Sequence, residues 1–218
     1  VLVHSLLGAA ALPALVALMP SQPALAFGIA RIAGVFGFGA IAWWATWAGV
    51  DSWRTDSLAA LAVILVAAGA IAGSRRRDAI AAAWSREGWR AEAVFAVLYA
   101  AAIALRVSNP DLWTPGYGGE KPMDFAILNA VVHADAFPPL DPWFAGGRLN
   151  YYYGGFVPVA ALAKLTGTPP VVATNLAVAL WMALTGAGLF ALARTLALVL
   201  PGVAERRATL AGAIATIA

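Results

Sequence analysis

Long runs of apolar residues are the feature that most limits what this chain can fold into. These runs cover residues 2–19, 25–50, 57–73, 91–105 and 171–200, and most approach the roughly 20 residues that a helix needs to cross a bilayer. Only 11% of the residues are charged, whereas soluble domains carry about 25%. Backbone groups in lipid must form their hydrogen bonds within the protein, which favours helices. The sequence therefore predicts an all-α, polytopic transmembrane protein.

The arginines gather between the apolar runs. Five of them lie between Arg75 and Arg90, and three more, Arg194, Arg206 and Arg207, lie at the end of the last long run. Basic residues concentrate in cytoplasmic loops, so segment 74–90 is expected to be cytoplasmic. This distribution argues against nucleic-acid binding, despite a net charge of +3. The chain has no Cys, which excludes disulfides and thiolate chemistry.

These patterns divide the chain into three parts. We expect three transmembrane helices in 1–73, a cytoplasmic Arg-rich segment over 74–90, and a third part over 91–218. The third part is expected to hold a transmembrane helix (91–105), an extracytoplasmic loop (106–150), an interfacial or re-entrant helix (151–166), a transmembrane helix (171–200) and the start of another (208–218). A helix over 151–166 reaches only about 24 Å, against a hydrocarbon core of about 30 Å. The chain is expected to be a fragment of a longer, multi-pass protein of the cell membrane.

The loop over 106–150 differs from the rest of the chain because it is acidic and rich in Pro, Gly and aromatic residues. It holds five of the eleven acidic residues: Asp111, Glu120, Asp124, Asp135 and Asp141. Apolar residues in 123–136 recur at spacings of three and four, which predicts a helix, and Pro138–Pro139 is expected to end it. Glu120 and Asp124 are four residues apart near its start, so both carboxylates are expected on one side.

Two interpretations of this acidic pair stay open. In the first, Asp124 acts as a general base or a ligand of a divalent metal ion, with Glu120 as its partner. In the second, both acids only cap the helix, because negative charge stabilises the first turn of a helix. The chain carries no phosphate-binding loop, dinucleotide fingerprint or zinc signature. The candidate substrate-binding residues are Lys121, Asp141, Trp143, Asn150, Tyr151, Tyr152 and Tyr153.

Each of these binding candidates has a plainer alternative. Lys121 suits a phosphate group, and the aromatic rings suit the apolar faces of sugars. However, Asp141 before Pro142 is also a common way to begin a turn. The three tyrosines also suit an interfacial anchor, and three adjacent side chains cannot all face one ligand.

Four motifs in the loop are specific enough to support a resemblance. They are NPDLW (109–113), GGEKPMDF (118–125), FPPLDPWFAGG (137–147) and NYYY (150–153). With them, residues 105–168 resemble the polytopic membrane proteins named after their YYY motif, a domain of unknown function.

The order of the elements is also similar, more distantly, to the GT-C superfamily of membrane glycosyltransferases. This resemblance implies transfer of a sugar from a polyprenyl-phosphate-linked donor at the extracytoplasmic face, with Glu120 and Asp124 as catalytic residues. Many of those enzymes carry two adjacent acids, whereas here the two acids are four residues apart. Two other functions stay open: a non-catalytic protein that binds a lipid-linked glycan or a partner, and a transporter. The apolar runs hold few ionisable residues, which disfavours the transporter.

Overall fold

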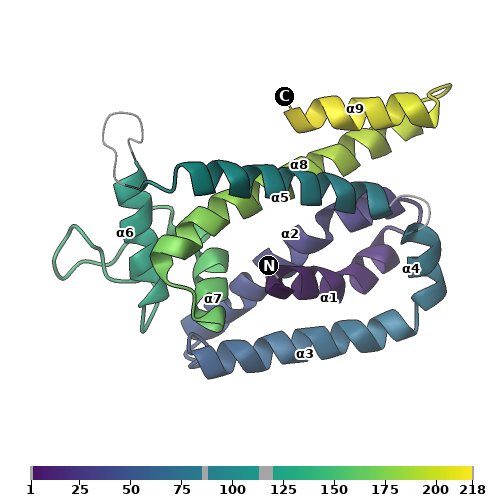
Figure 1. The fold of residues 1–218 in the computed structure, drawn as a ribbon. Helices are drawn as coiled ribbons and strands as arrows, with labels where there is room; N and C mark the ends of the chain where they lie inside the picture. The colour runs from purple at the N-terminus through teal and green to yellow at the C-terminus, as the bar shows by residue number, and fades with distance from the viewer. Residues whose placement is uncertain (1, 85–87, 113–119, 218) are drawn as a thin grey trace. The chain divides into compact units, whose positions relative to one another are not determined.

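The computed structural model describes residues 2–84, 88–112 and 120–217 and consists of helices joined by turns and one long loop (Figure 1). It is 78% helical, and no strand occurs among the described residues. Four described helices are long and apolar enough to cross a membrane: α2 (Pro23–Trp47), α3 (Thr55–Ser74), α5 (Trp89–Ser108) and α8 (Pro170–Val199). The prediction of an all-α, polytopic membrane protein is therefore confirmed.

The remaining helices are shorter. They are α1 (Leu2–Leu18), α4 (Arg77–Ala83), α6 (Lys121–Val132), the 3-10 helix η2 (Tyr153–Phe156), α7 (Val157–Thr166) and α9 (Glu205–Ile217). The apolar helix α1 has 17 residues, so it reaches about 26 Å and is at the lower limit for a span. The 10 residues of α7 reach about 15 Å, roughly half of the hydrocarbon core. Its placement in the membrane interface remains a proposal.

Proline and glycine explain several helix ends. Proline lacks the N–H that a first helical turn leaves unpaired, and its φ angle suits that position. Accordingly, α2 begins at Pro23, α8 begins at Pro170, and Pro158 lies in the first turn of α7. Gly167 ends α7 in the left-handed conformation, with φ of 64°. These residues make the turns between the helices readable from the sequence.

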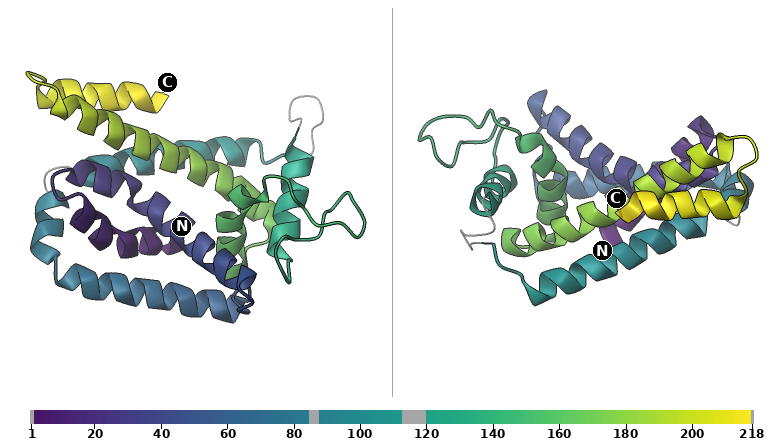
Figure 2. Two further views of the ribbon diagram at one scale, coloured as in Figure 1. Left: turned by 180° about the vertical axis from the view of Figure 1, so that it is seen from behind. Right: turned by 90° about the horizontal axis from the view of Figure 1, so that it is seen from above.

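The chain divides into two compact units, and the first holds both ends of the chain: Val1–Gly34, Leu65–Leu105 and Val178–Ala218. In this unit α9 runs back alongside α8 (Figure 2). Arg194 is fully buried there, and its Nη1 donates hydrogen bonds to the Glu205 carbonyl (2.9 Å) and to Thr209 Oγ1 (2.6 Å). The structure therefore gives Arg194 a role in joining α8 to α9, in addition to its contribution to the charge pattern.

Two polar residues of the first unit, His4 and Arg31, have partners inside the protein. Polar residues near the ends of apolar runs, such as His4 and Arg31, commonly extend their polar ends towards the membrane surface. Instead, His4 is buried and lies against the rings of Phe95 and Tyr99. Arg31 forms a two-pronged ion pair with Glu92, at 2.7 and 2.5 Å. A charge in an apolar helix needs such a partner, and only the fold brings Glu92 to it.

The second unit comprises Val35–Ile64 and Arg106–Ala177 and contains the acidic loop. Here α6 and α7 lie side by side (Figure 1). Four aromatic rings form a core in this unit, and they come from α2, the turn after α2, the loop after α6, and η2. The ring of Phe137 lies 4.8 Å from Trp53 and 6.0 Å from Tyr153, and Tyr153 lies 6.2 Å from Trp43. These rings fix the segments on either side of the candidate site.

The helix expected over 123–136 is found over Lys121–Val132, and tertiary contacts explain its earlier end. The last carbonyls of a helix have no partner within the helix. In α6 three side chains supply partners: Trp53 Nε1 donates to the Val131 carbonyl (2.9 Å), Lys164 Nζ donates to the Val132 carbonyl (3.1 Å), and His133 Nδ1 lies 2.9 Å from the Asn129 carbonyl. Two of these donors come from distant parts of the chain, so the sequence pattern did not reveal them.

Candidate active site

The two candidate acids lie at the start of α6, in the second unit. Glu120 occupies the N-cap position and is exposed, while Asp124 lies in the first turn and is half-buried. Pro122 in the first turn explains why the helix begins here, because proline favours this position. Glu120 makes no side-chain capping hydrogen bond to the first backbone N–H groups. Simple N-capping by Glu120 is therefore not what the structure shows.

The Asp124 carboxylate is held by a residue of the tyrosine triplet. The hydroxyl of Tyr152, immediately before η2, donates a hydrogen bond of 3.2 Å to Asp124 Oδ1. Within the described part of the chain, Asp124 Oδ2 has no hydrogen-bond partner. One carboxylate oxygen is thus fixed while the other remains available to accept a proton or a hydrogen bond.

The electrostatics keep Tyr152 in its donating form. Desolvation, the negative charge of Asp124 and the hydrogen bond between the two raise the pKa of Tyr152 to about 12, with a smaller contribution from the charge of Glu120. Both carboxylates therefore act on the same phenol group. At neutral pH Tyr152 is protonated and donates to Asp124.

Two cations, Arg106 and Lys121, share one backbone oxygen, and Lys121 follows Glu120 directly in the chain. Lys121 Nζ donates to the Asp111 carbonyl at 3.5 Å, and Arg106 Nη2 donates to the same carbonyl at 3.3 Å. Arg106 also donates to Asn175 Oδ1 from Nε (2.8 Å) and from Nη2 (2.5 Å). Arg106 in this way joins the end of α5 to the first turns of α8.

Sequence reasoning did not select Arg106 and Asn175 as site residues. A basic residue at the end of an apolar run, as Arg106 is, commonly extends towards the membrane surface. The one signal that could have revealed this contact is Asn175, a polar amide within the apolar run 171–200. A buried or half-buried amide needs hydrogen-bond partners, but the sequence did not say which residue provides them.

The tyrosine triplet is divided between two environments. Tyr151 and Tyr152 are 57% and 46% exposed, whereas Tyr153 is 9% exposed and belongs to the aromatic core. Asn150, immediately before them, is exposed. Tyr152 is thus the member of the triplet that the structure brings to the acids, and Tyr153 has a structural role.

The hairpin-like turn over 138–149 carries two further candidates. Asp141 Oδ1 accepts hydrogen bonds from the backbone N–H groups of Trp143 (2.8 Å) and Phe144 (3.1 Å). Within the described residues, Asp141 forms no hydrogen bond or ion pair with Asp124 or Glu120. Asp141 therefore stabilises its turn, and this turn presents the exposed rings of Trp143 and Phe144.

The donor set for a metal ion is small. No group of three His, Cys, Asp or Glu residues in the described part of the chain lies close enough to hold a metal ion. The described carboxylates near the site are those of Glu120 and Asp124, and Mg²⁺ often takes only one or two carboxylates from a protein. The steps proposed below are those that the side chains of this chain carry.

Comparisons with known proteins identify a family. The model of a family described as uncharacterized membrane protein (DUF2298) matches residues 38–218. The matched residues include the candidate site, the last part of α2, and all of α3, α5 and α8. No curated protein and no solved structure matches the chain.

Proposed function

We propose that this chain, which belongs to the DUF2298 family of uncharacterized membrane proteins, is a GT-C-like membrane glycosyltransferase. Its donor would be a sugar linked to a polyprenyl phosphate, and transfer would take place at the extracytoplasmic face. The proposal rests on the position of Asp124. It lies in the loop between two membrane-spanning helices, is half-buried, and is oriented by Tyr152 through one oxygen only.

This geometry suits a general base. The acceptor hydroxyl attacks the anomeric carbon of the sugar, and Asp124 Oδ2 takes the hydroxyl proton as the new C–O bond forms. The bond between the anomeric carbon and the phosphate oxygen breaks, and the polyprenyl phosphate leaves with the electron pair. Tyr152 keeps the carboxylate oriented by donating to Oδ1. Inversion of configuration at the anomeric carbon follows from a single displacement.

The departing phosphate needs positive charge nearby. Lys121, one residue after Glu120, is the best candidate because the hydrogen bond that the structure describes for its Nζ is a long one, 3.5 Å to the Asp111 carbonyl. An ammonium group so held can turn to a phosphate oxygen at little cost. Arg106 is held more firmly by Asn175, so we assign it the task of positioning the loop.

A second function, glycan binding without chemistry, is favoured by one specific observation. The rings of Trp143 and Tyr151 are exposed, and aromatic rings of this kind pack against sugar faces without any catalytic group. In that case the same loop would bind a lipid-linked glycan and leave it intact.

Turnover of a polyprenyl-phosphate-linked hexose per folded molecule in liposomes distinguishes these functions. Asp124→Asn is expected to reduce turnover by about 10² to 10⁴ because a general base is lost. Glu120→Gln is expected to reduce it less, because Glu120 contacts Tyr152 only through its charge. Asp135→Asn, an exposed acid on the same loop, is the matched control and should keep wild-type turnover.

Near wild-type turnover in both site variants would remove the catalytic role of these acids. Binding of the lipid-linked sugar by the wild type without turnover would favour the binding protein instead.

A further inference from the structure

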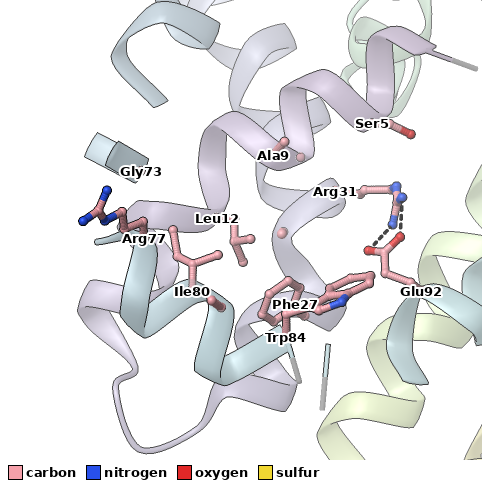
Figure 3. Close-up of a pocket in the computed structure, with 13 residues that line it drawn as sticks. Ser5, Ala9, Leu12, Phe27, Arg31, Gly73, Arg77, Ile80, Trp84 and Glu92 are labelled. Atoms are coloured by element: carbon pink, nitrogen blue, oxygen red, sulfur yellow. Dashed lines mark hydrogen bonds and ion pairs between the residues drawn. The ribbon is translucent and has the colours of Figure 1, made fainter. Parts of the chain in front are cut away.

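A pocket of about 610 Å³ lies in the first unit, away from the acidic loop in the sequence. It is lined by residues from α1, α2, α4, the end of α3 and the start of α5, which include Leu12, Phe27, Arg31, Gly73, Arg77 and Ile80 (Figure 3). Its volume is within the range of about 300–1,000 Å³ that is usual for sites that bind small molecules. The pocket is therefore large enough to hold part of a ligand.

The middle of the pocket is apolar. Leu12 and Ile80 pack against a buried cluster that contains Phe27, and the rings of Phe27 and Trp84 lie 5.6 Å apart. On one side the pocket is bounded by the ion pair between Arg31 and Glu92, whose charges compensate each other. Figure 3 shows Leu12, Ile80 and Phe27 between this pair and Arg77. Such a lining suits a hydrocarbon chain.

The opposite side of the pocket carries the positive charge of Arg77, which is only weakly paired among the described residues. Arg77 is 83% exposed, and its contact with Asp78 is a distant one, 3.7 Å, between two exposed side chains. An ion pair of this kind contributes little and is easily exchanged for another anion. Arg75 and Arg76, which precede Arg77, are exposed but do not line the pocket, so Arg77 supplies its basic edge. The pocket thus combines an apolar interior with a basic edge.

The position of the pocket along the helices indicates which ligand suits an apolar interior with a basic edge. Gly73 lies at the end of α3, and the lining continues through α4 to Glu92 in the first turn of α5. Since α3 and α5 are long and apolar enough to span, their ends mark the level at which hydrocarbon gives way to lipid headgroups. Phosphate groups of lipids are concentrated at this level, and basic residues there attract anionic lipids.

We propose that this pocket binds an anionic glycerophospholipid. One acyl chain occupies the apolar middle, between Leu12, Phe27 and Ile80, and the phosphate pairs with Arg77. The lipid connects α1, α3 and α4 at a point where α4 is only seven residues long. This assignment does not depend on the glycosyltransferase proposal.

Native mass spectrometry of the detergent-solubilised full chain tests the assignment, with phosphatidylglycerol as the probe and phosphatidylcholine of the same acyl chains as its uncharged counterpart. The wild type should retain one phosphatidylglycerol in preference to phosphatidylcholine. Arg77→Gln should weaken phosphatidylglycerol binding about fivefold, because each basic residue near an anionic lipid contributes about that factor. Arg75→Gln removes the same charge from a residue outside the pocket lining and should leave binding unchanged.

A second variant tests the apolar part. Ala81 lines the pocket and is exposed, so Ala81→Phe places a ring in the pocket without disturbing a buried contact. It should reduce retention of both lipids, while the melting temperature of the lipid-free protein stays close to that of the wild type. Equal retention of the two lipids by the wild type, or an equal effect of Arg75→Gln and Arg77→Gln, would overturn the assignment. So would full retention by Ala81→Phe, or a lipid-free dimer that fills the pocket with a second copy.

Discussion

The hydroxyl of Tyr152 donates a 3.2 Å hydrogen bond to Oδ1 of Asp124, 28 residues earlier in the chain. This contact joins the two parts of the loop that carry its most specific motifs, the acidic start of α6 and the tyrosine triplet. It also separates the functions of three adjacent tyrosines, since Tyr153 is directed into the aromatic core. The first two predictions follow from it.

Removing only the hydroxyl tests whether Tyr152 positions the candidate base. Tyr152→Phe should lower turnover about 10- to 100-fold, because a hydrogen bond to a charged group contributes about 1.5–3 kcal/mol. Tyr151→Phe is the matched control, since Tyr151 is similarly exposed and forms no hydrogen bond to Asp124. Equal turnover in the two variants would show that the Tyr152 hydroxyl does not position the base.

The raised pKa of Tyr152 predicts a particular pH dependence. The folded-state pKa of about 12 is above the usual value of 10.0, so the hydrogen bond contributes fully to stability below about pH 10. That contribution is lost as the pH rises through about 12. Ultraviolet titration of tyrosinate, with the curve of Tyr152→Phe subtracted, measures this group among the five tyrosines. Asp124→Asn should move its pKa down towards 10, and an unchanged pKa would exclude the influence of Asp124.

The hydrogen bond from Trp53 to α6 predicts a loss of stability. Trp53 is 2% exposed, and its Nε1 donates to the Val131 carbonyl at 2.9 Å. Trp53→Phe removes one of two donors to that carbonyl, which also accepts from the Ala134 N–H at 3.3 Å, and should cost about 1 kcal/mol. Trp47→Phe, at an exposed position, should cost much less. Thermal unfolding of both variants in detergent measures the difference, and similar melting temperatures would contradict it.

The ion pair between Arg31 and Glu92 predicts a larger effect. The two side chains are 17% and 29% exposed, so Glu92→Gln leaves Arg31 largely buried without a counter-charge. Breaking a buried pair in this way costs about 3–5 kcal/mol, and partial exposure places the expectation near the lower figure. Asp56→Asn, in an exposed pair with Arg54, should cost much less, because solvent screens exposed ion pairs. Unfolding of the two variants in the same detergent is the measurement, and equal losses would argue against a structural role for the inner pair.

The charge pattern predicts the orientation in the membrane. Segment 74–90 is expected in the cytoplasm and loop 106–150 outside, so single cysteines there should react with an impermeant reagent from opposite sides. Ser85 and Gly118 would also serve for this labelling, but both lie outside the described residues. Ser74→Cys and Ala145→Cys use exposed, described positions in a chain that has no other cysteine. Reaction of both from one side would make the orientation wrong.

The sequence by itself determined the fold class and the approximate helix boundaries. Apolar length sets where a chain crosses lipid, and proline and glycine set where a helix begins and ends; α2, α8 and Gly167 follow these rules. The sequence also pointed to the start of α6, since a carboxylate pair four residues apart is a local property of a helix. Such features depend on neighbours in the chain, so no tertiary information is needed to read them.

Only the tertiary structure decided which residues meet across the chain. The partner of Asp124, the burial of Tyr153 and the pairing of Arg106 with Asn175 all join residues from separate elements. The end of α6 at Val132 also depends on tertiary contacts, because Trp53 and Lys164, from distant parts of the chain, donate hydrogen bonds to its last carbonyls. A polar group in an apolar surrounding must find a partner, and the sequence states this requirement. Which partner meets it depends on how the helices pack.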